Sequence, residues 1–110
     1  MAAEINWSEK ASSNLQHIHD YIASDSRYYA ERFITTLILS VEKQLKSQPL
    51  SGRSIPEFEG TLLGFLREVL FKGYRIVYNP SKAPARITII TVLNSKMDVQ
   101  KQVNQSWIID

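Results

Sequence analysis

The charged pair most suited to chemistry in this sequence is Glu68 and Arg75. The two residues flank Lys72-Gly73, a dipeptide that can form a tight β-hairpin turn. In that register their side chains share one face of the sheet as diagonal neighbours. Two interpretations remain open: a salt bridge across the sheet face, or an arginine that binds a phosphate or a protein partner.

The histidines His17 and His19 raise the question of a metal site. Residues two positions apart on a helix point about 200° away from each other, so these two cannot bind one ion together. The sequence has no cysteine, its glycines are scattered rather than gathered in a phosphate-binding loop, and no Ser-His-Asp set stands out. We therefore expect neither a metal nor a cofactor.

Length and composition predict one domain that covers residues 1–110. The chain is 44% hydrophobic and 22% charged, which is an ordinary globular balance. No apolar run reaches the roughly 20 residues of a membrane span, and the N-terminal residues lack a signal-like run. The absence of cysteine agrees with a reducing compartment. We expect a cytoplasmic protein without a membrane partner.

The charges are divided unevenly along the chain. Residues 1–60 hold six Lys/Arg and eight Asp/Glu, which gives −2, whereas residues 61–110 hold seven Lys/Arg and three Asp/Glu, which gives +4. A basic second half suits an acidic partner, either nucleic acid or protein, although an ordinary solvated surface would also explain it.

Two amphipathic helices that form an antiparallel hairpin are predicted in the first half. Ser8 is a plausible N-cap of the first helix, Asp25-Ser26 provides a break and a second N-cap, and Pro49 ends the second helix. The apolar stripes that define their buried faces are Ala11, Leu15, Ile18 and Ile22, then Ala30, Ile34, Leu37, Ile38, Val41 and Leu45.

The second half favours an antiparallel meander of three strands. They are predicted at residues 62–71, 74–79 and 86–93, and a weak final helix at residues 94–107. Arg67 falls by parity on the helix-facing side, so either a bulge intervenes or its guanidinium reaches the rim. The other residues predicted to face the helices are Phe65, Val69, Phe71, Tyr74, Ile76 and Tyr78.

Between the two halves lies PLSGRSIPEF, residues 49–58. Its prolines and glycine exclude a regular element, and it stands where a helical hairpin must connect to a sheet. We interpret it mainly as a structural joint, pinned across the gap by Leu50, Ile55 and Phe58, with a functional loop as the alternative.

Five motifs occur in an order that resembles a known family. They are WSEKASSNLQHIHDYIA, DSRYYAERF, PLSGRSIPEF, LREVLFKGYRIVY and ITIITVLNSKMD. Over about Trp7 to Lys101 the chain resembles the RelE/ParE superfamily of type II toxin–antitoxin toxins, and the ParE branch most closely. The resemblance implies an α+β fold with a short N-terminal strand, a helical hairpin and a curved antiparallel sheet. It also implies a cognate antitoxin, a role in plasmid stabilisation, and a homodimer or a heterotetramer with the antitoxin.

The resemblance leaves two activities to separate. RelE-like toxins cleave mRNA on the ribosome, which requires a base, an acid and cations on the phosphate. Arg75 matches the family's strand arginine, but FLREVLFK lacks a lysine pair and Asn94 stands where many relatives have histidine. We therefore expect a ParE-like inhibitor of DNA gyrase that acts by binding rather than as an enzyme. The alternatives are a ribosome-dependent endoribonuclease, with Arg75 as its catalytic residue, and a non-toxic antitoxin-binding remnant. The residues we expect to bind partners are Arg67, Arg75, Lys96, Trp107 and Leu39.

Overall fold

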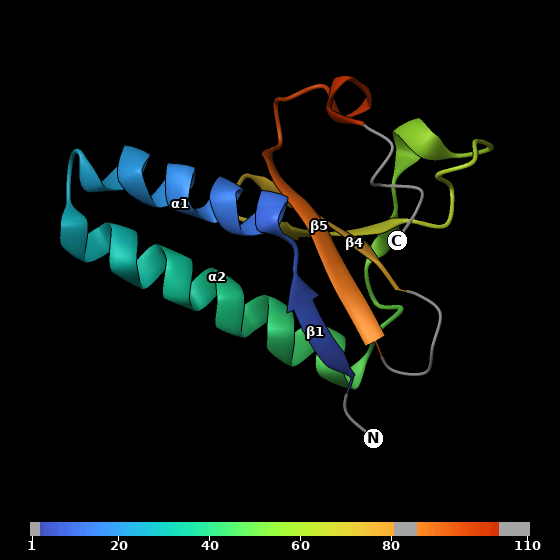
Figure 1. Cartoon of the computed structure of the whole chain (residues 1–110), viewed down its shortest axis with the longest axis horizontal. Helices are drawn as coiled ribbons and strands as arrows, with labels where there is room; N and C mark the ends of the chain where they lie inside the picture. The colour runs from blue at the N-terminus through green and yellow to red at the C-terminus, as the bar shows by residue number, and fades with distance from the viewer. Residues whose placement is uncertain (1–2, 81–85, 104–110) are drawn as a thin grey trace.

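The helices and strands follow one another as an α+β chain in a computed structural model that describes residues 3–80 and 86–103. Figure 1 shows the two long helices side by side and the strands crossing beside them. The elements are β1 (Glu4–Trp7), α1 (Glu9–Ala23), α2 (Arg27–Ser47), β2 (Arg53–Ser54), η1 (Pro56–Phe58), β3 (Arg67–Phe71), β4 (Tyr74–Asn79), β5 (Arg86–Asn94) and η2 (Val99–Gln102).

The five strands form one mixed sheet in the order β1-β5-β4-β3-β2. The predicted meander is present as β3, β4 and β5, which pair antiparallel. The short N-terminal strand implied by the resemblance pairs parallel with β5, and two residues of the joint add an antiparallel edge strand, β2, that the sequence did not predict. The α+β fold is therefore confirmed, with a sheet wider than the three-stranded one expected.

Both helices of the hairpin begin where the predicted capping residues place them. The Ser8 hydroxyl accepts a hydrogen bond from the Ala11 N–H at 3.0 Å, and the Ser26 hydroxyl accepts one from the Tyr29 N–H at 3.2 Å. Each bond satisfies an N–H that has no partner inside the helix, so the caps fix both starting points.

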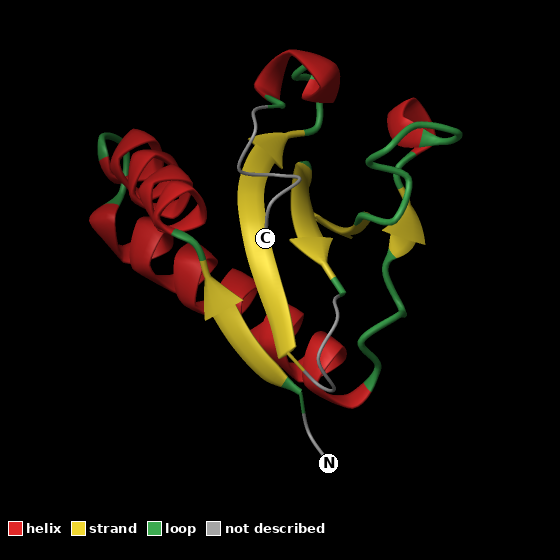
Figure 2. Ribbon diagram, turned by 45° about the vertical axis from the view of Figure 1, so that its right-hand side comes forward, coloured by secondary structure: helices red, strands yellow, loops and turns green. Residues whose placement is uncertain are grey.

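Apolar side chains pack on both faces of the sheet. In Figure 2 the helices lie on one side of the strands and the η1 segment lies on the other. The cluster under the helices includes Leu15, Leu37, Val41, Leu45, Val69, Ile76, Tyr78, Ile87, Ile89 and Val92. The second, smaller cluster consists of Ile55, Phe58, Leu63, Leu66, Val77, Ile90, Leu93 and Val99, with Val103 packed against it.

The hairpin between β3 and β4 has the predicted register. Lys72 and Gly73 both have positive φ, 42° and 88°, as the favoured two-residue hairpin turn requires. Phe71 pairs with Tyr74 and Leu70 pairs with Arg75. The alternation predicted for residues 69–78 is therefore correct.

The first strand of the meander is shorter than predicted. β3 starts at Arg67, because residues 58–66 form consecutive turns in which the N–H groups of Thr61, Gly64 and Leu66 each bond to the carbonyl three positions earlier. Phe65 consequently lies outside the strand and is 45% exposed rather than facing the helices. Turns with an i to i+3 spacing bury Leu63 and Leu66 together, a pattern that the sequence alone does not distinguish from a strand.

Two further expectations need correction. The final helix predicted for residues 94–107 is, in its described part, only the 3₁₀ turn η2, because Asn94 to Met97 form a turn and Asp98 caps the N–H of Gln100; residues 104–107 lie outside the described part. In the joint, Ile55 and Phe58 are buried as predicted, but Leu50 is 63% exposed.

Candidate functional site

Four charged side chains meet on the sheet face opposite the helices, and we call them the charge cluster: Arg53, Glu57, Glu68 and Arg75. β3 supplies Glu68 and β4 supplies Arg75, which are diagonal neighbours in the β3–β4 register. The joint supplies the other two, since β2 carries Arg53 and η1 carries Glu57. The cluster therefore connects the joint to the centre of the sheet.

Arg75 is held by two carboxylates at once. Its Nη1 and Nη2 atoms donate to the two carboxylate oxygens of Glu57 at 2.9 and 2.8 Å, a bidentate pair. Its Nε atom donates to Glu68 at 2.6 Å, and Nη2 makes a longer bond to the same carboxylate at 3.3 Å. The side chains of Arg75 and Glu68 are 7% and 0% exposed, so this arginine is buried and fully engaged.

Glu68 is shared between two arginines. Arg53 donates to its Oε2 atom from Nε at 2.7 Å, and the Arg53 side chain is 53% exposed. The two cations and two carboxylates of the charge cluster sum to zero net charge. Of the two interpretations that the sequence left open, the structure shows the salt bridge between Glu68 and Arg75 on the sheet face, and it belongs to a larger network than the sequence indicated.

The network changes the ionisation of its members. The hydrogen bonds from Arg75 lower the pKa of Glu57 from 4.5 to about 2, against the opposing effect of burial. The same bonds to Glu57, followed by those to Glu68, raise the pKa of Arg75. Both groups are therefore charged throughout the physiological pH range.

The joint is also fixed by a buried tyrosine. The Tyr78 hydroxyl accepts from the Gly52 N–H at 2.9 Å and donates to the Pro49 carbonyl at 2.8 Å. A Cβ atom at Gly52 would lie only 2.6 Å from the Tyr78 ring, so glycine is required by this close approach. Burial raises the pKa of Tyr78, which keeps its hydroxyl protonated as a donor.

The five residues predicted to bind partners are not gathered in one place. Arg67 reaches the rim, as one of its two alternatives proposed, where its Nη1 atom donates to the Gly52 carbonyl at 2.8 Å. Lys96 is exposed in the turn after β5, Leu39 is 62% exposed on α2, and Arg75 lies inside the charge cluster. Trp107 lies outside the described residues.

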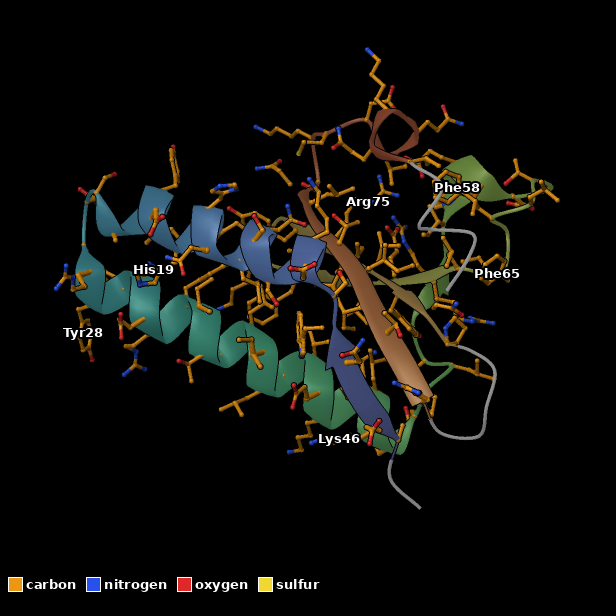
Figure 3. All side chains as sticks on the ribbon, viewed as in Figure 1. His19, Tyr28, Lys46, Phe58, Phe65 and Arg75 are labelled. Atoms are coloured by element: carbon orange, nitrogen blue, oxygen red, sulfur yellow. The ribbon has the colours of Figure 1, made fainter. Side chains whose placement is uncertain are left out.

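Glu57 is the member of the site that sequence reasoning did not connect with Arg75. Eighteen residues separate the two, and no periodicity relates a loop carboxylate to a strand arginine. Figure 3 shows Arg75 and Phe58, the neighbour of Glu57, on the same side of the molecule, far from Tyr28 at the end of the hairpin.

The histidines lie on the other part of the molecule. The His19 ring lies between Asp20 and Glu31, at 3.3 and 3.1 Å, and these hydrogen bonds raise its pKa. Among residues 3–80 and 86–103, no three His, Cys, Asp or Glu side chains are grouped as a metal ion requires. In the same part of the chain, no helix has the length and apolar character needed to cross a membrane.

The comparisons with known proteins agree with this architecture. Residues 5–99 match the family model described as the ParE toxin of the type II toxin–antitoxin system parDE. A solved structure titled "Chromosomal ParDE TA system from P. aeruginosa" is similar in fold, with a TM-score of 0.66 at 17% identity, over 86% of this chain and 98% of the other. The search of curated proteins found no match. Since the family model covers most of the chain, we conclude that the chain belongs to the ParE toxin family of type II toxin–antitoxin systems.

Proposed function

We propose that this chain is a toxin that inhibits DNA gyrase by binding and that a cognate antitoxin neutralises it. The observation that carries the proposal is that Glu57 and Glu68 both hold Arg75, the strand arginine that the nuclease alternative would use as its catalytic residue. A binding toxin needs a surface rather than an acid/base set, and an arginine locked between Glu57 and Glu68 suits a scaffold better than a catalytic centre.

The geometry weakens the endoribonuclease alternative in two ways. A phosphate approaching Arg75 would meet the carboxylates of Glu57 and Glu68, whose charge repels it. Of the two carboxylates that hold Arg75, Glu57 is the one that is partly exposed. Its pKa of about 2 makes it a poor general base at neutral pH.

The two histidines are also poorly placed to transfer protons in a nuclease site around Arg75. His17 and His19 both belong to α1, which packs on the opposite face of the sheet from the charge cluster. A nuclease would therefore have to assemble its acid and base from groups other than these.

The antitoxin is the partner that family membership supports. We propose that Arg67, Arg75, Lys96, Trp107 and Leu39 include contacts to the antitoxin or to gyrase, with Leu39 and Lys96 as the accessible members among the described residues. An acidic antitoxin segment that folds on binding could neutralise the basic second half of the chain. Such a complex should associate more slowly as salt is added.

Expression of the chain in bacteria separates the alternatives. We expect growth arrest with a DNA-damage response and filamentation while mRNA stays intact, and purified chain should inhibit supercoiling by purified gyrase. New mRNA cuts in primer extension, with normal supercoiling, would establish the nuclease instead. No growth arrest, together with capture of the product of the neighbouring gene, would identify a non-toxic antitoxin-binding remnant.

A further inference from the structure

An aromatic pocket lies at the end of the helical hairpin, remote from the charge cluster. It is lined by Tyr21, Ile22, Ser24, Asp25, Ser26, Tyr29 and Phe33, which come from the end of α1, the connecting turn and the start of α2. The turn between α1 and α2 lies at one end of the molecule in Figure 1.

The pocket combines three aromatic residues with a carboxylate. Tyr21 and Tyr29 are 80% and 67% exposed, so most of each ring is accessible to a partner. Phe33 is anchored to the sheet by edge-to-face contacts with the rings of Phe71 and Tyr74, at centroid separations of 5.7 and 5.8 Å. Phe33 is therefore the fixed part of the aromatic lining, and Tyr21 and Tyr29 are its accessible part.

Asp25 gives the pocket its charge preference. Its carboxylate makes no ion pair and no side-chain hydrogen bond within residues 3–80 and 86–103, since Ser26 rather than Asp25 caps α2. Aromatic faces and a free carboxylate both attract cations, and together they repel anions.

A neighbouring contact shows the same chemistry within the chain. The Arg32 guanidinium carbon lies 5.6 Å from the centroid of the Tyr28 ring, and its Nη1 atom donates to the Tyr28 hydroxyl. The Tyr28 ring in turn meets the Tyr29 ring edge-on at 6.1 Å. Within the described residues, the other ring covered by a cation is Phe71, under Lys72, so Tyr21 and Tyr29 carry none.

We propose that this pocket binds an arginine side chain of a protein partner. The apolar lining accommodates the methylene stem, the tyrosine rings stack on the planar guanidinium, and Asp25 accepts its hydrogen bonds. Lysine fits less well, because its compact ammonium is strongly hydrated and lacks the planar fork. The inference concerns a recognition site on the hairpin and does not depend on whether gyrase is the target.

The test is an NMR titration of the full chain with the capped tripeptide acetyl-Gly-Arg-Gly-amide. We expect saturable shifts in the backbone amides of residues 24–29, with a Kd on the order of 1–10 mM for a single side chain. The isosteric citrulline peptide, which lacks the charge, should bind at least about threefold more weakly, and the lysine peptide should fall between them.

Matched variants locate the binding. Asp25→Asn should weaken the arginine peptide by about threefold. Tyr29→Ala should weaken it more than Tyr28→Ala, which removes an equally exposed tyrosine from the same helical turn without removing a pocket residue. Equal binding of the citrulline peptide, shifts that do not saturate, or equal effects of the two tyrosine variants in chains with unchanged spectra elsewhere would overturn the proposal.

Discussion

The two faces of the sheet are stabilised by different physics. Under the helices, the buried cluster is apolar apart from the Tyr78 hydroxyl, and it carries no charge, so its stability comes mainly from area removed from water. On the opposite face, a smaller apolar cluster adjoins four charges, of which Glu68 and Arg75 are almost fully buried. The stability of the apolar face depends on how completely its side chains fill the space between helices and sheet. The stability of the charged face depends on each charge keeping its partner.

The largest expected effect compares isosteric substitutions on the two faces. Glu68→Gln keeps the shape but removes the charge that faces Arg53 and Arg75, so we expect a loss of about 3–5 kcal/mol in the free energy of unfolding. Leu37→Met keeps the volume of a fully buried side chain on the other face, and we expect a loss below about 1.5 kcal/mol. Urea unfolding measures both. Similar losses for the two variants would break the distinction between the faces.

The next effect tests the contact that attaches the joint to the sheet. Gly52→Ala places a Cβ atom 2.6 Å from the Tyr78 ring and 2.9 Å from the Glu68 carbonyl oxygen, so ring and backbone must both move. We expect a loss of about 1–3 kcal/mol in the free energy of unfolding, as for overpacking in a core. Gly60→Ala is the control, since it has open space around it and costs only the strain of its positive φ, about 1 kcal/mol. A smaller loss of unfolding free energy for Gly52→Ala than for Gly60→Ala would show that the joint accommodates the added Cβ atom without strain.

A third prediction uses pH to measure the exposed part of the charge cluster. The pKa of Glu57 falls from 4.5 to about 2 on folding, so its stabilising contribution is present above pH 4.5 and is lost as the pH falls toward 2. Because the side chain is 35% exposed, solvent screening reduces the contribution to about 1 kcal/mol. Glu57→Gln should remove that part of the acid dependence, measured as the melting temperature between pH 4.5 and 2. An unchanged acid profile would assign the dependence to other carboxylates.

The smallest effect is expected at the outer end of the charge cluster. Arg53→Ala removes a half-exposed cation and leaves Glu68 still paired with Arg75, so we expect a loss below about 1 kcal/mol in the free energy of unfolding. A loss as large as that of Glu68→Gln would mean that buried Glu68 requires both arginines for its stability. The stability of the charged face would then depend on all four residues of the charge cluster.

The sequence predicted what local rules determine. Ser8 and Ser26 fixed the helix starts, and Lys72-Gly73 fixed the hairpin register that brings Glu68 beside Arg75. Local rules do not describe where a loop folds back, so the bidentate bond from Glu57 to Arg75 and the β2 edge strand were missed. The turns before β3 were mistaken for a strand because leucines at spacing three and alternating apolar residues look alike over a short run.

The parallel pairing of β1 with β5 has a consequence for the order of folding. It joins segments 82 residues apart, as in the bond from the Ser8 hydroxyl to the Ile90 carbonyl, whereas the helical hairpin and the β3–β4 hairpin close over short loops. Loop-closure entropy disfavours such a distant contact until the rest of the chain is already compact. We therefore expect β1 to pair with the sheet last, after the other strands have formed it. Ile5→Ala should then accelerate unfolding and leave the refolding rate nearly unchanged.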